Sequence, residues 1–438
     1  MSHEESSTTD SKQTDEGDPY PALDDGVYSL SRYFPIGTVY FYAFPAGEDS
    51  GFFNNIPAWV EELVAARPLL CAGDHVRVLT FDSVYTENIL RLLSEMGVEP
   101  LDSSRVIVLP KAISSDLAGK ERNDAIKSAI KHIKCERNLV MAQPFLDEDL
   151  KNAYQIPPEV SVWLNDKENM SEYIPAQHLP LEYAHFYSGK DFFSNEEVYP
   201  LPCVVKMTSS SAGDGVRICH TADDLKSAKD AFAKLSGHVI IYEFVQSVRN
   251  LCVQFGIPSD PSKKIDVIGF NEQVIGRCGE FLGGMVSSDV DSPELHDLFS
   301  LLQEDILPKV RAKGWHGVGG LDVLVTRDNE YYFIDPNFRM TATFVFVCQV
   351  RNKHMKKSLL GFSGIFKGTE ADFRQKILPI AKLGTPEQLL DIASLSCKDG
   401  VYHFNGAIVF DKNVPKEKAA KLLMERGVES LTLSCICS

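Results

Sequence analysis

The chain has 438 residues, a length that predicts two or three domains rather than a single core. Its 44 basic and 61 acidic side chains give a net charge of −17, which argues against a nucleic-acid or anionic-membrane surface. No run approaches the roughly 18 apolar residues that span a bilayer, and the acidic residues 1–24 have no signal-peptide core. A disordered acidic tail (1–24) on a cytoplasmic protein is expected, and ten scattered cysteines fit a reducing compartment.

Strand-like and helix-like runs alternate through the first third of the chain. This alternation predicts a parallel sheet with helices on its faces. No GxGxxG follows the first strand, so nothing indicates a dinucleotide site there. The expected strands are 37–44, 75–81, 105–110 and 138–144, and the expected helices are 56–70, 83–97 and 122–134.

Strands predominate from residue 201 onward. Residues 202–207 and 237–245 read as strands around a helical run at 221–236, and further strands follow at 264–290. One helix is expected at 293–313, and the last 80 residues indicate a small α/β appendage with a strand at 402–410 and a helix at 416–427. The closing Cys435 and Cys437 offer only two soft metal ligands, which is a weak signal.

A hairpin is predicted in the segment GGLDVLVTRDNEYYFIDPNFR. A two-residue turn at Asp328 and Asn329 would pair Arg327 with Glu330, Val325 with Tyr332 and Val323 with Ile334. Continued inward, this register places Asp322 directly opposite Asp335, with their Cβ atoms about 4.5–5.5 Å apart.

Two facing carboxylates require a shared proton or a cation. Asn337 lies on the same strand face as Asp335 and adds an amide oxygen, so the set favours a hard cation such as magnesium. Arg339, two residues further, has the planar fork that binds phosphate or carboxylate. The alternative is a solvated strand end with ordinary polar residues.

A phosphate-binding loop is indicated in LPCVVKMTSSSAGDGVRICH. Lys206 ends a buried strand, and a run of small residues follows whose backbone N–H groups can cover phosphates. An ordinary hairpin loop would also look like this, and no Walker motif closes the run. The next strand, VIIYEFV, ends at Tyr242 and Glu243, which suits either a nucleotide base or an ordinary strand end.

Taken in order, these segments resemble the ATP-grasp ligases. The matching stretches are NDKENM, CVVKMTSSSAGDGV, VIIYEFV, GGLDVLV and FIDPNFR, spread over about residues 160–345. The segment IGFNEQVIGRCGEFLGG and the ending FRMTAT narrow the likeness to amino-acid and peptide ligases with an N-terminal pre-ATP-grasp domain.

The resemblance implies a role for each matching residue. Asp322, Asp335 and Asn337 would bind Mg²⁺ (or Mn²⁺), and Arg339 would be the catalytic residue that holds the acyl phosphate or substrate carboxylate. Asp335 stands where the family usually has Glu, and only Asn250 or Arg249 is offered for ribose. The residues expected to bind ATP are Lys167, Lys206, Ser209, Ser210, Ser211, Gly213, Gly215, Tyr242, Glu243, Phe244 and Val245.

The resemblance also implies the architecture and the activity. After the tail, a pre-ATP-grasp α/β domain is expected at 25–162, a two-lobed ATP-grasp domain at 163–350 with its lid lobe at about 200–248, and a C-terminal α/β subdomain at 351–438. The implied activity is an ADP-forming carboxylate–amine ligase that makes an amide or peptide bond through an acyl phosphate. The expected substrates are an amino acid or a small natural-product carboxylate, and an amine.

Three matters stay open at this stage. A phosphotransferase to a hydroxyl acceptor and a non-catalytic nucleotide-binding regulator are the rival functions. His178, His185 and His316 are candidates for a general base, although a lone His is more often structural. Neither a nucleic-acid nor a membrane partner is expected, and homodimer formation is left open.

Overall fold

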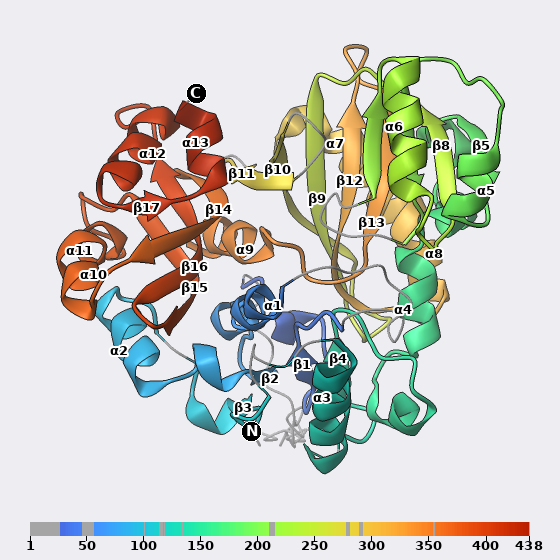
Figure 1. The fold of residues 1–438 in the computed structure, drawn as a ribbon. Helices are drawn as coiled ribbons and strands as arrows, with labels where there is room; N and C mark the ends of the chain where they lie inside the picture. The colour runs from blue at the N-terminus through green and yellow to red at the C-terminus, as the bar shows by residue number, and fades with distance from the viewer. Residues whose placement is uncertain are drawn as a thin grey trace, which may run out of the picture.

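The computed structural model describes residues 27–45, 57–99, 101–113, 117, 119–133, 135–209, 215–276, 281–288, 292–353 and 355–437. Three β-sheets organise these residues, and helices pack against each of them (Figure 1). The predicted α/β class, with a parallel N-terminal sheet and mainly antiparallel sheets after it, is confirmed.

The N-terminal sheet has four parallel strands in the order β3-β2-β1-β4. The expected helix at 56–70 is shorter, because Pro68 lacks an N–H and the chain turns into a 3-10 helix at Arg67–Leu70. The second helix begins at Glu87 and not at 83, because the Thr86 side chain caps it by accepting from Ile89 N. The elements are β1 (Val39–Phe41), β2 (Arg77–Thr80), β3 (Val106–Val108), β4 (Leu139–Met141), α1 (Ala58–Val64), α2 (Glu87–Glu95) and α3 (Gly119–Ile133).

A smaller antiparallel sheet has the order β5-β8-β6-β7. Helices α5 and α6 pack together beside it, and Thr221 forms a capping box with Asp224 at the start of α6. This sheet begins well before residue 200, where the lid lobe was expected to start. Its elements are β5 (Glu182–Phe186), β6 (Cys203–Met207), β7 (Val216–Cys219), β8 (Val239–Glu243), α5 (Gly189–Ser194) and α6 (Ala222–Phe232).

The largest sheet has nine strands in the order β13-β12-β9-β10-β11-β14-β16-β15, with β17 paired to β14. Because β11 pairs with β14, residues after 351 extend the same sheet (Figure 1). The division at 162 and 350 stays a prediction. The strands are β9 (Arg249–Ile257), β10 (Asp266–Ile275), β11 (Phe281–Val286), β12 (Gly317–Val325), β13 (Tyr331–Asn337), β14 (Ser358–Lys367), β15 (Leu390–Lys398), β16 (Val401–Phe410) and β17 (Val428–Glu429).

The single helix expected at 293–313 is interrupted. A π-helical turn at Leu302–Ile306 separates its two α-helical parts, and Pro308 removes the N–H that a continuous helix would need. The remaining helices are α4 (Pro158–Asn165), α7 (His296–Leu301), α8 (Leu307–Ala312), α9 (Phe344–Lys353), α10 (Glu370–Lys376), α11 (Leu378–Ala381), α12 (Lys416–Glu425) and α13 (Leu431–Cys437).

Within the described ranges, no helix combines the length and apolar character needed to cross a bilayer. The nine cysteines that the structure describes form no disulfide with one another. Cys435 and Cys437 are exposed, and no third metal-ligating side chain joins them among the described residues.

Candidate functional site

The hairpin of β12 and β13 brings the two predicted acids face to face. Asp322 pairs with Asp335, as predicted, and Gly320 pairs with Asn337. The inner face of the hairpin is fully buried at Val323 and Phe333, so the acids lie on the opposite face. The apolar residues of the hairpin therefore pack in the core, and its polar residues face the opposite side.

The rest of the predicted register is wrong by one residue. Val325 pairs with Tyr331 and Val323 with Phe333, because the turn has three residues, 327–329, and not two. Asn329 has a φ of 59°, a left-handed conformation that Asn tolerates in such turns. A bulge on β13 then inserts one extra residue, Ile334, and this restores the pairing of Asp322 with Asp335.

The bulge has a consequence for the cavity beside the hairpin. Ile334 and Asp335 are consecutive residues, yet both line that cavity, which has a volume of about 770 Å³. The Ile334 carbonyl accepts a hydrogen bond from Lys206 Nζ at 3.1 Å. A regular strand would turn one of these two residues away from the cavity.

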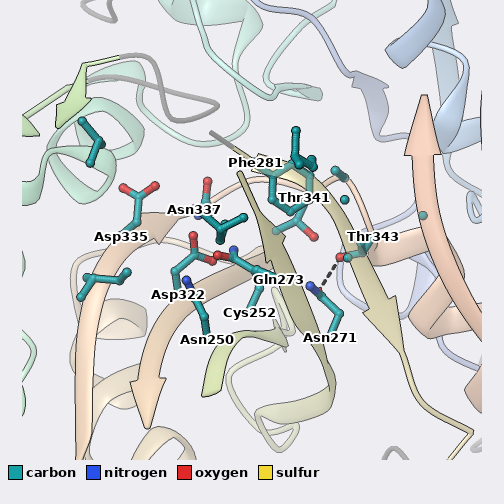
Figure 2. Close-up of a pocket in the computed structure, with 18 of the residues that line it drawn as sticks. Asn250, Cys252, Asn271, Gln273, Phe281, Asp322, Asp335, Asn337, Thr341 and Thr343 are labelled. Atoms are coloured by element: carbon teal, nitrogen blue, oxygen red, sulfur yellow. Dashed lines mark hydrogen bonds between the residues drawn. The ribbon is translucent and has the colours of Figure 1, made fainter. Parts of the chain in front are cut away.

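Asp322, Asp335 and Asn337 point into the same part of the cavity (Figure 2). Burial, followed by repulsion from Asp335, raises the pKa of Asp322 to about 7. Its Oδ1 atom is buried and has no hydrogen-bond partner among the described residues. Such an oxygen, beside a second carboxylate and an amide, fits the ligand set of a hard cation.

Lys167 neutralises one of the two acids. Its Nζ lies 2.7 Å from Asp335 Oδ1, and its side chain is only 3% exposed. The lysine expected to contact phosphate therefore holds a carboxylate in the ligand-free protein. Asp322 forms no ion pair within the described ranges.

Lys206 lies on β6 of the smaller sheet and faces the same acids across the cavity. Burial lowers its pKa to about 8, against the favourable field of Asp335. Its Nζ also lies 6.0 Å from the centre of the Tyr242 ring. The smaller sheet thus presents a cation to the acidic hairpin.

Arg339 also lines the cavity and is held by Asn165 at the end of α4. Its Nη1 donates to Asn165 Oδ1 at 3.1 Å, and the same oxygen accepts from Phe338 N at 2.9 Å. The guanidinium lies 5.9 Å from the centre of the Phe44 ring. Asn165 belongs to the NDKENM segment, so that segment positions the arginine as well as supplying Lys167.

Residues 242–245, which were predicted to line a nucleotide base, lie in the cavity wall. Glu243 Oε1 accepts from Leu181 N at 2.9 Å, and Glu243 N donates to Leu181 O at 2.9 Å. The carboxylate is thus already used to fix the chain entering β5. Whether it also contacts a ligand stays a prediction.

The predicted phosphate-binding loop lies mostly outside the described residues. Ser210, Ser211 and Gly213 are among those not described. Ser209 and Gly215 are described, and neither lines the cavity. Gly215 has a φ of 82°, and its carbonyl accepts from Met207 N at 2.8 Å, which starts the pairing of β6 and β7.

Neutral polar residues on β9 and β10 also line the cavity, and sequence reasoning missed all but Asn250 (Figure 2). Arg249, the other ribose candidate, instead pairs with Glu272 and Glu294. Alternation of polar residues along two otherwise apolar strands was the available signal. Together with two threonines after β13, the group is Asn250, Cys252, Asn271, Gln273, Thr341 and Thr343.

A buried hydrogen-bond network supports these polar residues of the cavity. Gln254 Nε2 donates to Asn271 Oδ1 at 3.1 Å and to Thr343 Oγ1 at 3.2 Å. Gln254 Oε1 accepts from Thr341 Oγ1 at 2.8 Å, and Thr343 Oγ1 donates to Asn271 Oδ1 at 2.6 Å. Networks of this kind fix side-chain orientation beneath a site.

The far walls of the cavity come from the two ends of the chain. Tyr42, Phe44 and Arg67 line it from the N-terminal domain, and Ser363 and Asn405 line it from β14 and β16. A single cavity therefore touches all three predicted structural regions, which suits a site for more than one ligand.

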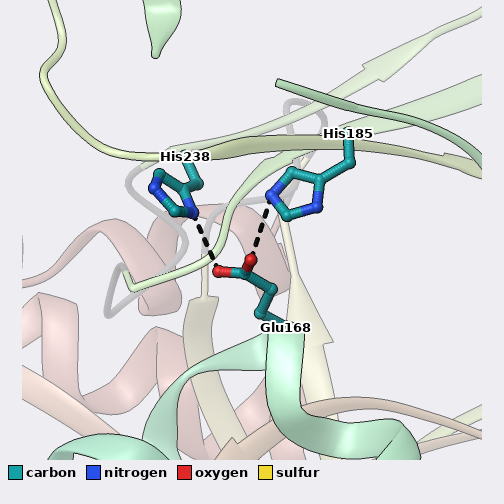
Figure 3. A group of neighbouring side chains, drawn as sticks. All are labelled: Glu168, His185 and His238. Carbon is teal, nitrogen blue, oxygen red and sulfur yellow. Dashed lines mark hydrogen bonds and ion pairs between the residues drawn. The ribbon is translucent and has the colours of Figure 1, made fainter. Parts of the chain in front are cut away.

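A second polar cluster lies beside Lys167 but outside the cavity lining. Glu168 contacts His238 Nδ1 at 2.9 Å and His185 Nε2 at 3.3 Å (Figure 3). The two histidines lie on β5 and just before β8, so this cluster ties the 3-10 turn Lys167–Glu172 to the smaller sheet.

The three histidines considered as general bases do not line the cavity. His185 belongs to the Glu168 cluster, and His178 Nδ1 lies 3.0 Å from the Tyr331 carbonyl. Burial lowers the pKa of His316 to about 4. Each of them therefore has a structural setting away from the acids.

Comparison with known proteins identifies the architecture. Residues 184–337 match the family described as L-aspartate–L-methionine ligase, ATP grasp. An N5-carboxyaminoimidazole ribonucleotide synthetase solved with ADP is similar over 91% of this chain and 98% of its own, with a TM-score of 0.54 and 12% identity. A biotin carboxylase from Campylobacter jejuni, solved as a β,γ-ATP complex, is similar over 86% of this chain and 92% of its own, with a TM-score of 0.52 and 14% identity.

A third solved structure agrees with these two. An N5-carboxyaminoimidazole ribonucleotide synthetase from Thermus thermophilus covers 82% of this chain and 95% of its own, with a TM-score of 0.51 and 11% identity. At such identities the likeness shows the fold. Together with the family match, it confirms the expected ATP-grasp superfamily and its class of ligases.

Proposed function

We propose that this ATP-grasp ligase joins a small carboxylate, such as an amino acid, to an amine and forms ADP through an acyl phosphate. One observation carries the proposal: two buried lysines, two facing aspartates, an asparagine and an arginine meet in one cavity. A carboxylate and an amine do not condense at neutral pH without activation, because the leaving group would be oxide. These charges suit the transfer of a phosphoryl group.

The acids are proposed to hold Mg²⁺ (or Mn²⁺) together with ATP phosphates. Asp322, Asp335 and Asn337 supply the oxygens that such a cation prefers, and the orphaned Asp322 Oδ1 supports this assignment. When bound, the ion would neutralise charge on the transferred phosphoryl group. Gln273, Cys252 and Arg339 offset only part of the effect of burial on Asp322, whose pKa stays raised.

The nucleotide is proposed to lie between the smaller sheet and the hairpin. Lys206 and Lys167 would contact its phosphates, and residues 242–245 would line the base. The loop from Ser209 to Gly215 is proposed as the cover, through Ser209, Ser210, Ser211, Gly213 and Gly215. Excluding water there would protect the acyl phosphate from hydrolysis.

The reaction would proceed in two displacements. A carboxylate oxygen of the substrate attacks the γ-phosphorus, and the bond to the β-phosphate oxygen breaks to release ADP. The amine then attacks the carbonyl carbon, inorganic phosphate leaves, and the nitrogen loses a proton. Arg339 is proposed to hold the reacting carboxylate and the phosphoryl group during both steps, since Asn165 keeps its fork oriented.

A phosphotransferase would use the same cations with a hydroxyl acceptor, and a regulator would bind the nucleotide without turnover. The ligase reading alone predicts that ADP release requires both a carboxylate and an amine. The partners proposed are therefore small molecules, and the family match favours amino acids among them.

The deciding experiment is a matrix of amino acids and small carboxylates against amines with MgATP, read by phosphate release and product mass. A product equal to the two substrates minus water supports the ligase. Hydroxylamine, which traps an acyl phosphate as a hydroxamate, should replace the amine. ADP release with a hydroxyl compound alone would instead identify a phosphotransferase, and no release with any pair would indicate a regulator.

A further inference from the structure

Arg67 is a buried cation in the cavity wall, and none of the described residues supplies a countercharge for it. It begins the 3-10 turn that follows α1, and it is 9% exposed. Its Nε is buried without a hydrogen-bond partner, and no carboxylate within the described ranges forms an ion pair with it. Burial lowers its pKa, and the interaction with Tyr42, which includes a side-chain hydrogen bond, opposes this effect. An arrangement of this kind is costly unless a ligand supplies the missing charge.

The neighbouring acids are committed elsewhere. Glu61 and Glu62 lie on α1, close to Arg67 in sequence, but both pair with Arg122 at 2.9 and 3.3 Å. Arg122 is 3% exposed, so the fold does pair a buried arginine where it serves structure alone. Because no described carboxylate pairs with Arg67, the contrast indicates that its charge serves a purpose other than the stability of the fold.

Arg67 and Arg339 lie on the same aromatic wall. The Arg67 guanidinium is 5.9 Å from the centre of the Tyr42 ring, and the Arg339 guanidinium is 5.9 Å from the centre of the Phe44 ring. The two rings meet edge to face, with centres 5.0 Å apart. An aromatic pair thus separates the two arginines, and all four side chains line the cavity.

We infer that Arg67 binds the carboxylate that does not react, namely the α-carboxylate of an amino acid serving as the amine substrate. The inference rests on the proposed ligase function, in which Arg339 takes the reacting carboxylate. A planar guanidinium in a dry wall binds a carboxylate through two parallel hydrogen bonds, and that ligand supplies the charge the fold withholds. The product would then be a dipeptide or a similar compound with a free carboxyl end.

The first test is direct binding, which does not depend on turnover. Calorimetry would compare L-methionine with L-methioninamide, and L-aspartate with its α-amide and its β-amide, for wild type and Arg67→Met. Wild type should bind a free acid about 10- to 100-fold more tightly than the matching amide, as expected for charge-assisted hydrogen bonds. Arg67→Met should lose that preference, and Arg67→Lys should keep part of it.

The same probes distinguish a carboxylate on the amine substrate from a second carboxylate on the activated substrate. If wild type binds L-methionine more tightly than L-methioninamide, and L-methionine is the amine substrate in the ligation assay, then Arg67 holds the carboxylate of the amine substrate. If the β-amide of L-aspartate is the only amide that binds more weakly than its free acid, Arg67 instead holds a second carboxylate on the activated substrate. That result overturns the assignment to the amine substrate. Wild type that binds every acid and amide equally overturns the carboxylate site altogether.

The second test uses stability, with Arg122→Met as the matched control. In ligand-free buffer Arg67→Met should unfold at the same temperature as wild type or higher, because it removes an unpaired buried charge. Arg122→Met should unfold at a lower temperature, because it removes the arginine that pairs with the buried Glu61 and Glu62. Equal destabilisation by both variants would mean that Arg67 is structural, and would refute the inference.

The two proposals fail separately. If acids and amides are discriminated through Arg67 but no pair of substrates releases ADP, the carboxylate site stands and the ligase does not. If ligation occurs and Arg67→Met changes neither the KM for the amine substrate nor its preference for free acids, the ligase stands and the carboxylate site does not. An increase in that KM of about 10-fold or more, with a smaller change in kcat, is the expected result.

Discussion

Replacing Asp322 by Asn should stabilise the metal-free protein at neutral pH. Asp322 is half-buried with a fully buried Oδ1 atom, lacks an ion-pair partner among the described residues and faces Asp335 across the hairpin. The change keeps the shape of the side chain and removes its charge. It therefore isolates the electrostatic cost that the wild type bears until a cation binds.

The magnitude follows from the pKa of Asp322, which is raised from 3.8 to about 7. A difference of this size corresponds to about 4 kcal/mol for the charged form at high pH. Between the two values the folded state holds a proton that the unfolded state has lost, so stability falls as pH rises. From pH 5 to pH 7, wild type should lose about 2 kcal/mol relative to Asp322→Asn.

Urea unfolding in EDTA at pH 5 and pH 7, followed by tryptophan fluorescence, measures this difference. Trp315 is a suitable reporter, because it packs in the core that also contains Val323 and Phe333. His316 has a lowered pKa of about 4, but it titrates in both proteins and cancels in the comparison. Asp335→Asn is the control and should destabilise at both pH values, because it removes the carboxylate that pairs with the buried Lys167.

Two outcomes would refute the reasoning. The electrostatic account fails if the stability difference between wild type and Asp322→Asn is the same at pH 5 and pH 7. The metal assignment fails if magnesium and ATP raise the stability of Asp322→Asn as much as that of wild type.

The remaining predictions concern the cations and the Glu168 cluster. Arg339→Lys should lower the ligation rate about 100-fold and leave nucleotide affinity, measured by calorimetry, nearly unchanged; a parallel loss of affinity would place Arg339 in the nucleotide site. The affinity of wild type for MgATP should fall as pH rises through about 8, where Lys206 loses its proton, and Lys206→Arg should flatten that fall between pH 7 and pH 9. Glu168→Gln should raise hydrogen exchange in β5 and β8, whereas Glu172→Gln on the same turn should not; equal exchange in both variants would contradict the link.

The hairpin shows how far sequence reasoning reaches. The facing acids were predicted from a two-residue turn, and that turn does not exist. The three-residue turn and the bulge at Ile334 each shift the register by one, in opposite senses, so the prediction of Asp322 opposite Asp335 was right for an incomplete reason. Alternation of apolar residues fixes which face is buried, but it does not reveal a bulge.

Other features required three-dimensional information. Arg67 and Tyr42 belong to the N-terminal domain, and no local pattern links them to β12 and β13, which lie far later in the chain. The pairing of β11 with β14, which joins the C-terminal region to the central sheet, is equally non-local. Lys167 was predicted to contact phosphate, but its contact with Asp335 depends on the geometry of the assembled cavity.

The contact between Lys167 and Asp335 also bears on how ligands would enter the site. A lysine paired with a carboxylate is not free to hold phosphate, and an aspartate paired with a lysine is a weaker metal ligand. Separating the two groups removes an ion pair from a lysine that is only 3% exposed, and Asp322 beside it already lacks an ion-pair partner in the described chain. Nucleotide and cation supply opposite charges, so each offsets the cost that binding the other creates. This argues that the two bind as one complex, with the lysine passing to phosphate as the aspartate passes to the cation.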